Sequence, residues 1–524
     1  MSLENVLYKL RMTRNMSQEQ FAELLGISRQ SVQKWESGAS VPKLDMLVRI
    51  GKHFGVSLDT LILDSNGRFI EEMNTNRQLR PNYEKMHKWE IYCADLLTEY
   101  EQSTDEGLDL RIYEGVFQAV AMLPTNEIKK SLGDILFEAV INAKTVDNYP
   151  YNEPSDLEEI LNCRTAAPAL PALDKTRLEH KLLGAWTGRI CGCLFGKTVE
   201  GIKTDELIPF LKETGNYPLH RYILQSDISE EILNKYKYRF TGRCYADAVD
   251  GFPADDDINY TVLAQQIVER YGRSFTSCDV SREWLDLQSK NVCCTAERVA
   301  YRNFINGYEP PETAVYKNPY REWIGAQIRG DYFGYINPGD PELAAEMAYR
   351  DACISHVKNG IYGEMFVAAM LAAAACTNDI ETILTSGLAQ IPHTSRLHAA
   401  ISDVLAGYEK GVSKEDCFAD IHARFNEYTE HGWCHTIPNA MIVAAGLLYG
   451  GGDYSKSLCM TVETGFDTDC NAATVGSILG MANGIESIAS CWTKPLNGKL
   501  HTSIFGMETT TIAERVAQTL QHIQ

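Results

Sequence analysis

The fold is decided by the stretch TGFDTDCNAATVGSILG, residues 464–480. Its second half is apolar or small on every side, which predicts a buried helix beginning near Asn471. Two carboxylates at positions i and i+2 point to different sides of a helix, so Asp467 and Asp469 converge only from a turn that leads into it. Alternatively, one of them simply caps the helix and favours the positive end of its dipole.

Glycine recurs at every fourth residue in two parts of the chain. This spacing places the glycines of each set on one side of a helix, where a neighbouring backbone can approach closely. The two sets are Gly476, Gly480 and Gly484 in the later part, and Gly184, Gly188, Gly192 and Gly196 in the earlier part. The pattern predicts tightly packed core helices.

A second acidic cluster, Asp255-Asp256-Asp257, opens another predicted helix, which is amphipathic and stops at Gly272. Two unit charges about 4 Å apart repel by about 1 kcal/mol in water and by about 4 kcal/mol at an effective dielectric of 20. If the two acidic clusters meet, they therefore need a cation. Hard oxygen ligands without interleaved His or paired Cys suit magnesium, manganese or calcium rather than zinc or iron.

The spacing of the acidic motifs resembles that of the ADP-ribosylglycohydrolase family, which includes the glycohydrolase that reactivates ADP-ribosylated dinitrogenase reductase. A third motif, GAWTGRICGCLFGKTVE at residues 184–200, is similar to the opening helix of that family and ends in Glu200. The resemblance covers roughly residues 175–500. It implies an all-helical fold in which the acidic motifs bind two Mg2+ ions, with Mn2+ as a substitute, and in which the glutamate lies beside the scissile bond.

The resemblance also implies roles for single residues. The expected metal ligands are Asp255, Asp256, Asp257, Asp467, Asp469 and Cys470. The expected catalytic residues are Glu200, Asp256 and Asp469. Two positions depart from the family pattern: Cys470 stands where many relatives have Thr and is a poorer ligand for magnesium, and Asp255 stands where many have Ser or Thr and adds charge. The departures suggest a divergent branch whose substrate need not be an ADP-ribosylated protein.

Further stretches match the family less sharply. The expected substrate-binding residues are His356, Gly363, Glu364, Asn439 and Gly465. Residues 350–366 resemble the helix and glycine turn that line the ribose side of the pocket, although a lone His such as His356 is also typical of a satisfied core residue. Residues 325–331 stand where relatives have a glycine loop around the diphosphate, and a plain turn fits them equally well.

The N-terminal residues predict a compact bundle of short helices. Ser17 caps one helix, which Gly26 ends, and Ser28 caps the next helix, Arg29 to Glu36. Residues 17–38 resemble the lambda-repressor-like helix-turn-helix domain, also called XRE or Cro-like. In such domains the second helix of the motif enters the major groove. The resemblance therefore implies a double-stranded DNA operator as a partner.

The DNA contacts that the resemblance implies lie on and beside that second helix. The expected base-reading residues are Arg29, Gln30 and Gln33, and the expected phosphate contacts are Gln18, Ser28 and Lys34. The formal charge of the chain is −21, but residues 1–64 hold eight Lys or Arg and seven Asp or Glu, so the remainder carries −22. DNA contact is expected only at the N-terminus, and its weak basic balance keeps a protein-contacting bundle as the alternative.

We expect an all-α protein of three parts: a helix-turn-helix bundle over residues 1–66, a helical linker and dimerisation region over 67–174, and a large all-helical ADP-ribosylglycohydrolase-like domain over 175–524. The polar stretch 73–81 is the expected linker. Helix-turn-helix domains of this kind usually bind two half-sites, which favours a homodimer. Fifteen Cys without CxxC spacing favour reduced core thiols. Without a leader or a membrane-length apolar run, we expect a cytoplasmic protein with no membrane contact.

The two resemblances together imply a magnesium-dependent hydrolase of an N- or O-glycosidic ADP-ribosyl bond, fused to a sequence-specific DNA-binding domain in a transcriptional regulator. Two alternatives stay open. The large domain can be a sensor that binds ADP-ribose or a related nucleoside without turnover, or it can hydrolyse small ribosides.

Overall fold

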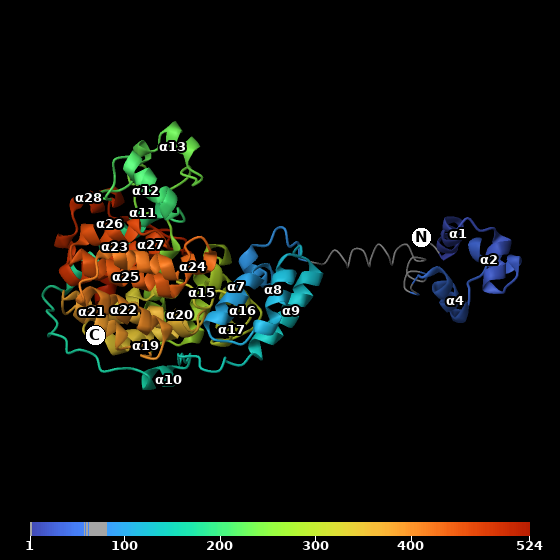
Figure 1. Ribbon diagram of the computed structural model, residues 1–524, viewed down its shortest axis with the longest axis horizontal. Coiled ribbons are helices and arrows are strands. Elements are labelled where there is room, and N and C mark those ends of the chain that lie inside the picture. The colour runs from blue at the N-terminus through green and yellow to red at the C-terminus, as the bar shows by residue number, and fades with distance from the viewer. Residues whose placement is uncertain (1–2, 57, 59–60, 62–80, 524) are drawn as a thin grey trace. The chain divides into compact units, whose positions relative to one another are not determined.

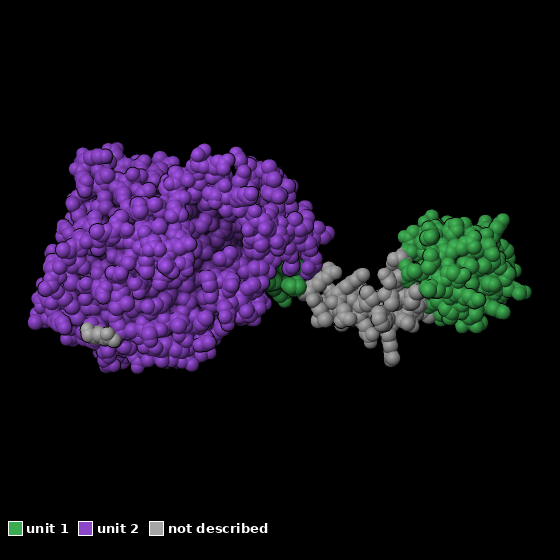
Figure 2. Space-filling view, turned by 90° about the horizontal axis from the view of Figure 1, so that it is seen from below, with its two compact units in different colours: residues 1–86 green, residues 87–524 purple. Residues whose placement is uncertain are grey.

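The computed structural model describes residues 3–56, 58, 61 and 81–523. The chain divides into two compact units, Met1–Met86 and His87–Gln524, which Figure 2 shows in different colours. Nearly all of the predicted linker at residues 73–81 lies outside the described residues.

Within the described part of the first unit, four helices form a bundle. They are α1 (Leu3–Thr13), α2 (Gln18–Leu25), α3 (Arg29–Glu36) and α4 (Leu44–Phe54). Ser17 and Gln20 form a reciprocal capping box at the start of α2, and Gly26 ends that helix in the left-handed region with φ of 61°. Ser28 caps α3, and Val32 and Trp35 are buried. The predicted bounds and caps of these helices are confirmed.

The second unit is helical almost throughout (Figure 1). Its α-helices are α7 (Leu96–Asp105), α8 (Glu114–Ala121), α9 (Glu127–Ile141), α10 (Leu157–Asn162), α11 (Leu178–Lys197), α12 (Thr204–Glu213), α13 (Glu230–Lys235), α14 (Asp256–Tyr271), α15 (Ser277–Leu287), α16 (Thr295–Ile305), α17 (Glu312–Val315), α18 (Asp331–Tyr335), α19 (Pro341–Ala352), α20 (Lys358–Ala374), α21 (Ile380–Leu388), α22 (Arg396–Glu409), α23 (Lys414–Arg424), α24 (Glu430–Cys434), α25 (Thr436–Gly450), α26 (Tyr454–Glu463), α27 (Thr468–Asn483), α28 (Ser490–Thr493) and α29 (Ile512–His522).

Shorter elements connect these helices. The 3-10 helices are η1 (Lys88–Glu90), η2 (Tyr92–Ala94), η3 (Arg111–Tyr113), η4 (Gln225–Asp227), η5 (Lys290–Val292), η6 (Gln327–Arg329), η7 (Ile485–Ser487) and η8 (Lys494–Leu496). Strands β1 (Lys499–His501) and β2 (Thr509–Thr511) form an antiparallel pair with Leu500 opposite Thr510. The all-α prediction is confirmed, with this small hairpin as an addition to it.

The centre of the second unit is the contact between α11 and α27. A Cβ atom added to Gly188 would overlap the carbonyl oxygen of Gly476, and one added to Gly480 would overlap that of Gly184. Gly192 and Gly196 meet the α27 backbone at Ala472 and Thr468 in the same way. The two glycine stripes predicted from the sequence therefore pack against each other, backbone on backbone, with the helices running in opposite directions.

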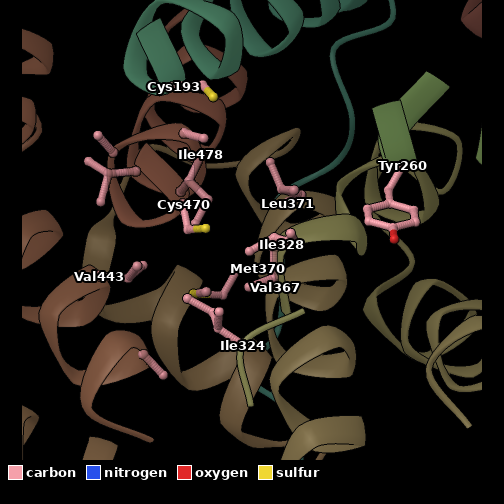
Figure 3. Close-up of a cluster of buried hydrophobic side chains, with 14 of the residues drawn as sticks. Cys193, Tyr260, Ile324, Ile328, Val367, Met370, Leu371, Val443, Cys470 and Ile478 are labelled. Carbon is pink, nitrogen blue, oxygen red and sulfur yellow. The ribbon is translucent and has the colours of Figure 1, made fainter. Parts of the chain in front are cut away.

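Two further helices complete the core around this pair. Helices α20 and α25 are buried along nearly their whole length, and both contact α27. Figure 3 shows how Met370 and Leu371 of α20, Val443 of α25 and Ile478 of α27 gather in one apolar cluster. The burial predicted for the helix after Asp469 is confirmed in α27.

Two details differ from the sequence prediction. Helix α27 begins at Thr468 rather than near Asn471, because Gly465 and Phe466, with φ of 77° and 57°, reverse the chain and the Thr468 hydroxyl bonds the carbonyl of Gly196. Asp469 therefore lies in the first turn of the helix. Gly363 lies inside α20 rather than in a glycine turn, since a small residue is needed there for close packing against Thr436.

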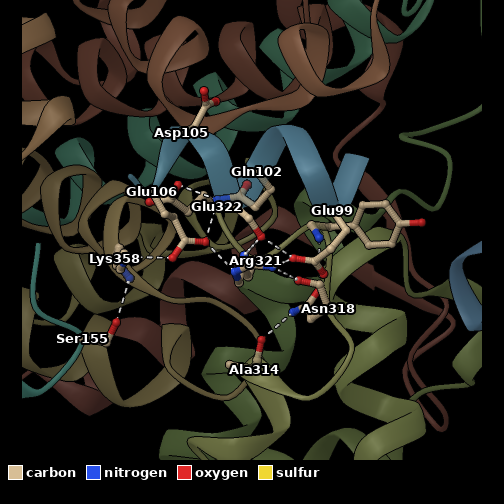
Figure 4. Close-up of polar contacts among 12 residues, drawn as sticks. Glu99, Gln102, Asp105, Glu106, Ser155, Ala314, Asn318, Arg321, Glu322 and Lys358 are labelled. Atoms are coloured by element: carbon tan, nitrogen blue, oxygen red, sulfur yellow. Dashed lines mark hydrogen bonds and ion pairs between the residues drawn. The ribbon is translucent and has the colours of Figure 1, made fainter. Parts of the chain in front are cut away.

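Residues 87–162 are packed onto the rest of the second unit through a buried polar network (Figure 4). Arg321 donates to Glu99 at 2.8 Å and to Glu106 at 2.5 Å. Gln102 of α7 donates to the fully buried Glu322 at 2.6 Å. Across the described residues, no helix is both long enough and apolar enough to span a bilayer.

The backbone contact between α11 and α27 can be tested by adding one methyl group. Gly188→Ala places that methyl on the carbonyl oxygen of Gly476, so we expect the free energy of unfolding of the second unit to fall by about 2 kcal/mol, within the range for overpacked cores. Urea denaturation followed by circular dichroism measures it. The control is Gly115→Ala in α8, where an added Cβ meets nothing within 4 Å, so its stability should be unchanged or higher by about 1 kcal/mol. Wild-type stability of Gly188→Ala would contradict the packing.

Candidate functional site

The two acidic motifs meet at the starts of α14 and α27, although more than 200 residues separate them in the sequence. One ligand atom each from Cys193, Asp255, Asp257 and Asp469 lie within 4.8 Å of one another. A second group, Asp467, Asp469 and Cys470, satisfies the same limit and shares Asp469 with the first. All of these side chains are buried. The structure thus brings together five of the six predicted metal ligands.

The start of α14 is held by its own cap. The Asp255 side chain accepts a hydrogen bond from the backbone N–H of Asp257 at 3.0 Å. Asp256 is half-buried and belongs to neither close group among the described residues. Burial, followed by the charge of Asp255, raises its pKa to about 6.

The start of α27 is held by Asn439 of α25. Its Oδ1 accepts hydrogen bonds from the backbone N–H of Asp467 at 3.2 Å and from Nδ2 of Asn471 at 2.7 Å. Its Nδ2 donates to the carbonyls of Trp433 and His435. Of the predicted substrate-binding residues, Asn439 and Gly465 therefore adjoin the acidic turn, and both shape the backbone that carries Asp467.

Two thiols lie among the carboxylates. Cys470 donates to Oδ2 of Asp257 at 3.4 Å, and Cys193 of α11 donates to Oδ1 of Asp255 at the same distance. Burial raises the pKa of both thiols. Cys193 is not among the residues predicted from the sequence, although it directly follows Gly192 of the stripe that packs against α27, which is a signal for its position.

Two cations lie against the cluster. Lys197, the last residue of α11, forms an ion pair with Oδ2 of Asp255. Burial lowers the pKa of Lys197, but the carboxylates of Asp255 and Asp469 outweigh it and hold that pKa above its usual value. Arg189, fully buried, lies 3.6 Å from Oδ1 of Asp257 and 2.9 Å from Asp331.

The donor set fits a divalent cation. Burial, followed by neighbouring carboxylates, raises the pKa of Asp257, Asp467 and Asp469, so a positive charge would stabilise their ionised forms. Asp257 is 1% exposed, yet its Oδ1 accepts no hydrogen bond. Carboxylate oxygens suit Mg2+ or Mn2+, whereas the two thiols are softer donors than Mg2+ prefers.

Glu200 lies just beyond the end of α11, in a turn held by Tyr238. The tyrosine hydroxyl donates to the carbonyls of Thr198 and Glu200, both at 3.1 Å. Arg243 stacks over the Tyr238 ring and lies 4.0 Å from the Glu200 carboxylate. The negative charge of Asp469, followed by burial, raises the pKa of Glu200 to about 8. Its side chain is still 36% exposed, which leaves it accessible to a substrate.

Three other predicted substrate-binding residues lie in the interior instead. Glu364 is fully buried and 3.6 Å from Arg329, which also pairs with Glu297 at 2.9 Å. His356 shares a hydrogen bond with Ser355 at 2.8 Å, and burial lowers its pKa well below the usual value. Gly363 packs between Thr436 and Gln327. These residues form or adjoin a buried network around Arg329 and are not part of either close acidic group.

A third group of possible ligands, Asp105, His431 and His435, has a structural explanation. His431 Nδ1 accepts from the Trp323 indole N–H at 3.1 Å, and its Nε2 pairs with Asp105 at 3.0 Å. Both ring nitrogens are therefore engaged, and the pair ties α7 to α24.

The second helix of the N-terminal motif presents a polar surface. Ser28, Arg29, Gln30, Gln33 and Lys34 are all exposed. Ser28 also caps α3, and Arg29 forms an exposed ion pair with Glu19 at 2.9 Å. Gln18 is half-buried and donates to Glu36 at 2.8 Å, so it is engaged inside the bundle.

Comparison with known proteins assigns each unit to a family. Residues 174–523, two thirds of the chain, match the ADP-ribosylglycohydrolase family, and residues 7–61 match a helix-turn-helix family. The HTH-type transcriptional activator BcrR of Enterococcus faecalis is 34% identical over 97 residues, which are 18% of this chain and 46% of BcrR. The HTH-type transcriptional regulator YonR of Bacillus subtilis (strain 168) is 36% identical over 63 residues, 12% of this chain and 58% of YonR. The chain thus spans about half the length of these curated relatives.

A solved structure, an ADP-ribosylglycohydrolase-related protein complex, has 19% sequence identity and a TM-score of 0.42, and the similarity covers 66% of this chain and 98% of that one. The family match over residues 174–523 supplies the assignment. The chain belongs to the ADP-ribosylglycohydrolase family and carries an N-terminal helix-turn-helix domain of the transcription-regulator type.

Proposed function

We propose that this protein is a divalent-metal-dependent hydrolase of an ADP-ribosyl N- or O-glycosidic bond that also binds a DNA operator and regulates transcription. The observation that carries the enzymatic part is the meeting of the two acidic motifs beside Glu200, with the buried Oδ1 of Asp257 accepting no hydrogen bond. Buried carboxylates at this spacing are energetically unfavourable without a cation, and with one they form a site that can bind and activate a substrate.

The acidic groups would hold the metal. The group Asp467, Asp469 and Cys470 and the group Cys193, Asp255, Asp257 and Asp469 offer places for two ions, with Mg2+ or Mn2+ as the ions that carboxylates prefer. A bound ion would hold ribose hydroxyls and a water molecule and lower the pKa of that water. We also retain Asp256 as a candidate ligand, because it lies between Asp255 and Asp257 at the start of α14.

The remaining chemistry falls to residues at the edge of the cluster. In its ionised form, Glu200 would accept a proton from the attacking water as the water oxygen bonds to the anomeric carbon. It would then deliver that proton to the leaving nitrogen or oxygen as the bond from that atom to the anomeric carbon breaks. Tyr238 fixes the turn that carries Glu200, and Asn439 fixes the turn that carries Asp467. Asp469 belongs to both acidic groups, and its charge has the largest effect on the pKa of Glu200. It is therefore the second catalytic candidate.

The N-terminal unit supplies the DNA-binding part. The exposed residues of α3 would enter the major groove, where Arg29, Gln30 and Gln33 meet base edges and Lys34 meets phosphate. Binding to two half-sites would require a homodimer. In this proposal the large domain reports ADP-ribosylation or ADP-ribose to the transcription machinery.

The enzymatic proposal is tested with Asp467→Ala, which removes a buried ligand of the acidic centre. We expect the rate of ADP-ribose release from ADP-ribosyl-arginine or ADP-ribosyl-serine to fall at least about 100-fold. Substitution of residues that support metal ligands typically reduces activity by about 10–100-fold, and loss of a ligand should reduce it at least as much. Liquid chromatography measures the released ADP-ribose. The control is Asp420→Ala on α23, an exposed carboxylate paired with Arg424, which should retain wild-type activity. Unchanged activity of Asp467→Ala would defeat the assignment.

The same assay separates the alternatives. A hydrolase of small ribosides would cleave simple nucleosides and leave ADP-ribosyl-arginine and ADP-ribosyl-serine intact. A sensor would bind ADP-ribose in calorimetry, consume none of the substrates, and change its operator affinity when the ligand is bound.

The DNA-binding proposal is tested with Gln33→Ala and Lys34→Ala in the full chain. Loss of a base contact should weaken binding to the selected operator by about 1–3 kcal/mol and relax its specificity, whereas loss of a phosphate contact should weaken all sequences alike and reduce the salt dependence. Fluorescence anisotropy over a range of salt concentrations measures both effects. Lys9→Ala, which removes an equal charge from the exposed surface of α1, is the control. If all three variants show the same operator affinity, specificity and salt dependence, then Gln33 and Lys34 do not contact the DNA.

A further inference from the structure

Lys197 is fixed at the acidic centre by the helix contact that organises the core. It directly follows Gly196, whose backbone packs against Thr468 and Asp469 at the start of α27. Its side chain is 21% exposed, while the Asp255 side chain it pairs with is 2% exposed. The ammonium group therefore lies against the group formed by Cys193, Asp255, Asp257 and Asp469 rather than in bulk solvent.

The two oxygens of Asp255 are already engaged by the chain itself. Oδ2 pairs with the Lys197 ammonium. Oδ1 accepts from the backbone N–H of Asp257 at 3.0 Å and from the Cys193 thiol at 3.4 Å. By contrast, Oδ1 of the equally buried Asp257 accepts no hydrogen bond. Asp255 is thus hydrogen-bonded at both oxygens, whereas Oδ1 of Asp257 has only the Arg189 guanidinium 3.6 Å away.

The other acidic group has no such cation. No ion pair joins Asp467 or Asp469 to a Lys, Arg or His among the described residues within 4.0 Å. A divalent ion placed there would meet Asp467, Asp469 and Cys470 without displacing the ammonium that is paired with Asp255. An ion on the Asp255 side would have to displace Lys197 or sit against its positive charge, which is unfavourable at short range in a buried site.

We propose that Lys197 is a tethered cation that takes the place of one of the two divalent ions, so that the protein binds a single ion at the group formed by Asp467, Asp469 and Cys470. This inference rests on the proposed function only in assuming that a divalent ion is used. Lys197 is a positioning residue in this arrangement, because it holds Asp255 and limits the ion to one side of the centre.

The experiment counts bound ions on the full chain without any substrate. Metal-free protein is equilibrated with Mn2+ by dialysis, and bound manganese is measured by elemental analysis and by loss of the free Mn2+ signal in electron paramagnetic resonance. We expect one Mn2+ per wild-type chain and two per chain in Lys197→Met, because the methionine leaves Asp255 without its cation. Lys197→Arg keeps the charge and should bind one.

The matched control removes a nearby lysine that does not pair with the aspartates. Lys203 stacks over the Trp433 ring with its Nζ 5.3 Å from the ring centre, so Lys203→Met should still bind one Mn2+. Circular dichroism and the thermal midpoint establish that each variant is folded. If Lys197→Met does not fold, the wild-type count still decides, since two ions per wild-type chain would overturn the inference. One ion in a folded Lys197→Met would overturn it as well.

The number of bound Mn2+ ions tests the role of Lys197, and the release of ADP-ribose tests the hydrolase, so either proposal can be refuted without the other. One ion in the wild type without ADP-ribose release leaves the inference standing and refutes the hydrolase. Two ions with ADP-ribose release support the hydrolase and refute the role of Lys197.

Discussion

The contact between the backbones of α11 and α27 is the constraint on which the functional centre depends. At Gly184, Gly188, Gly192 and Gly196 there is no room for a side chain between the helices. The two axes are therefore fixed to within the tolerance of van der Waals contact, because interiors packed this closely do not adjust continuously. Helix α11 and the turn after it carry Cys193, Lys197 and Glu200, and the start of α27 carries Asp467 and Asp469. The close packing of the glycines therefore fixes the distances between these side chains.

Charge is then balanced around that fixed frame. Buried carboxylates are costly unless they are paired or bind a cation, and each aspartate of the centre meets this requirement differently. Asp255 is paired with Lys197, Asp257 lies 3.6 Å from the buried Arg189, and the backbone N–H of Asp467 is held by Asn439. Asp255 therefore has a positively charged partner within the chain, whereas Asp467 and Asp469 form no ion pair with a Lys, Arg or His among the described residues.

Sequence reasoning found the parts of this arrangement that have a periodic or charged signature. The glycine stripes, the acidic motifs and the caps of α2 and α3 all carry such signals, and the structure places them as expected. Cys193 was not predicted, because a cysteine in an apolar helix resembles any other core residue; its place directly after Gly192 was the one signal that related it to the packed face. The start of α27 was misplaced by three residues because the reversal at Gly465 and Phe466 depends on a positive φ at a phenylalanine, which residue preferences do not predict. The roles of the site residues stay predictions.

The family match begins at residue 174, yet the buried charges of the second unit do not stop there. Arg321 is paired with Glu99 and Glu106 of the preceding segment, and Glu322, which also pairs with Arg396, accepts a hydrogen bond from Gln102. Removing one partner of a buried pair costs about 3–5 kcal/mol because the other charge is left in a low dielectric. Glu322 lies 3.6 Å from His435, whose carbonyl accepts from Asn439, the residue that holds the Asp467 turn. Residues 87–162 therefore lie in the same compact unit as the acidic centre and supply buried partners to the side chains that support it.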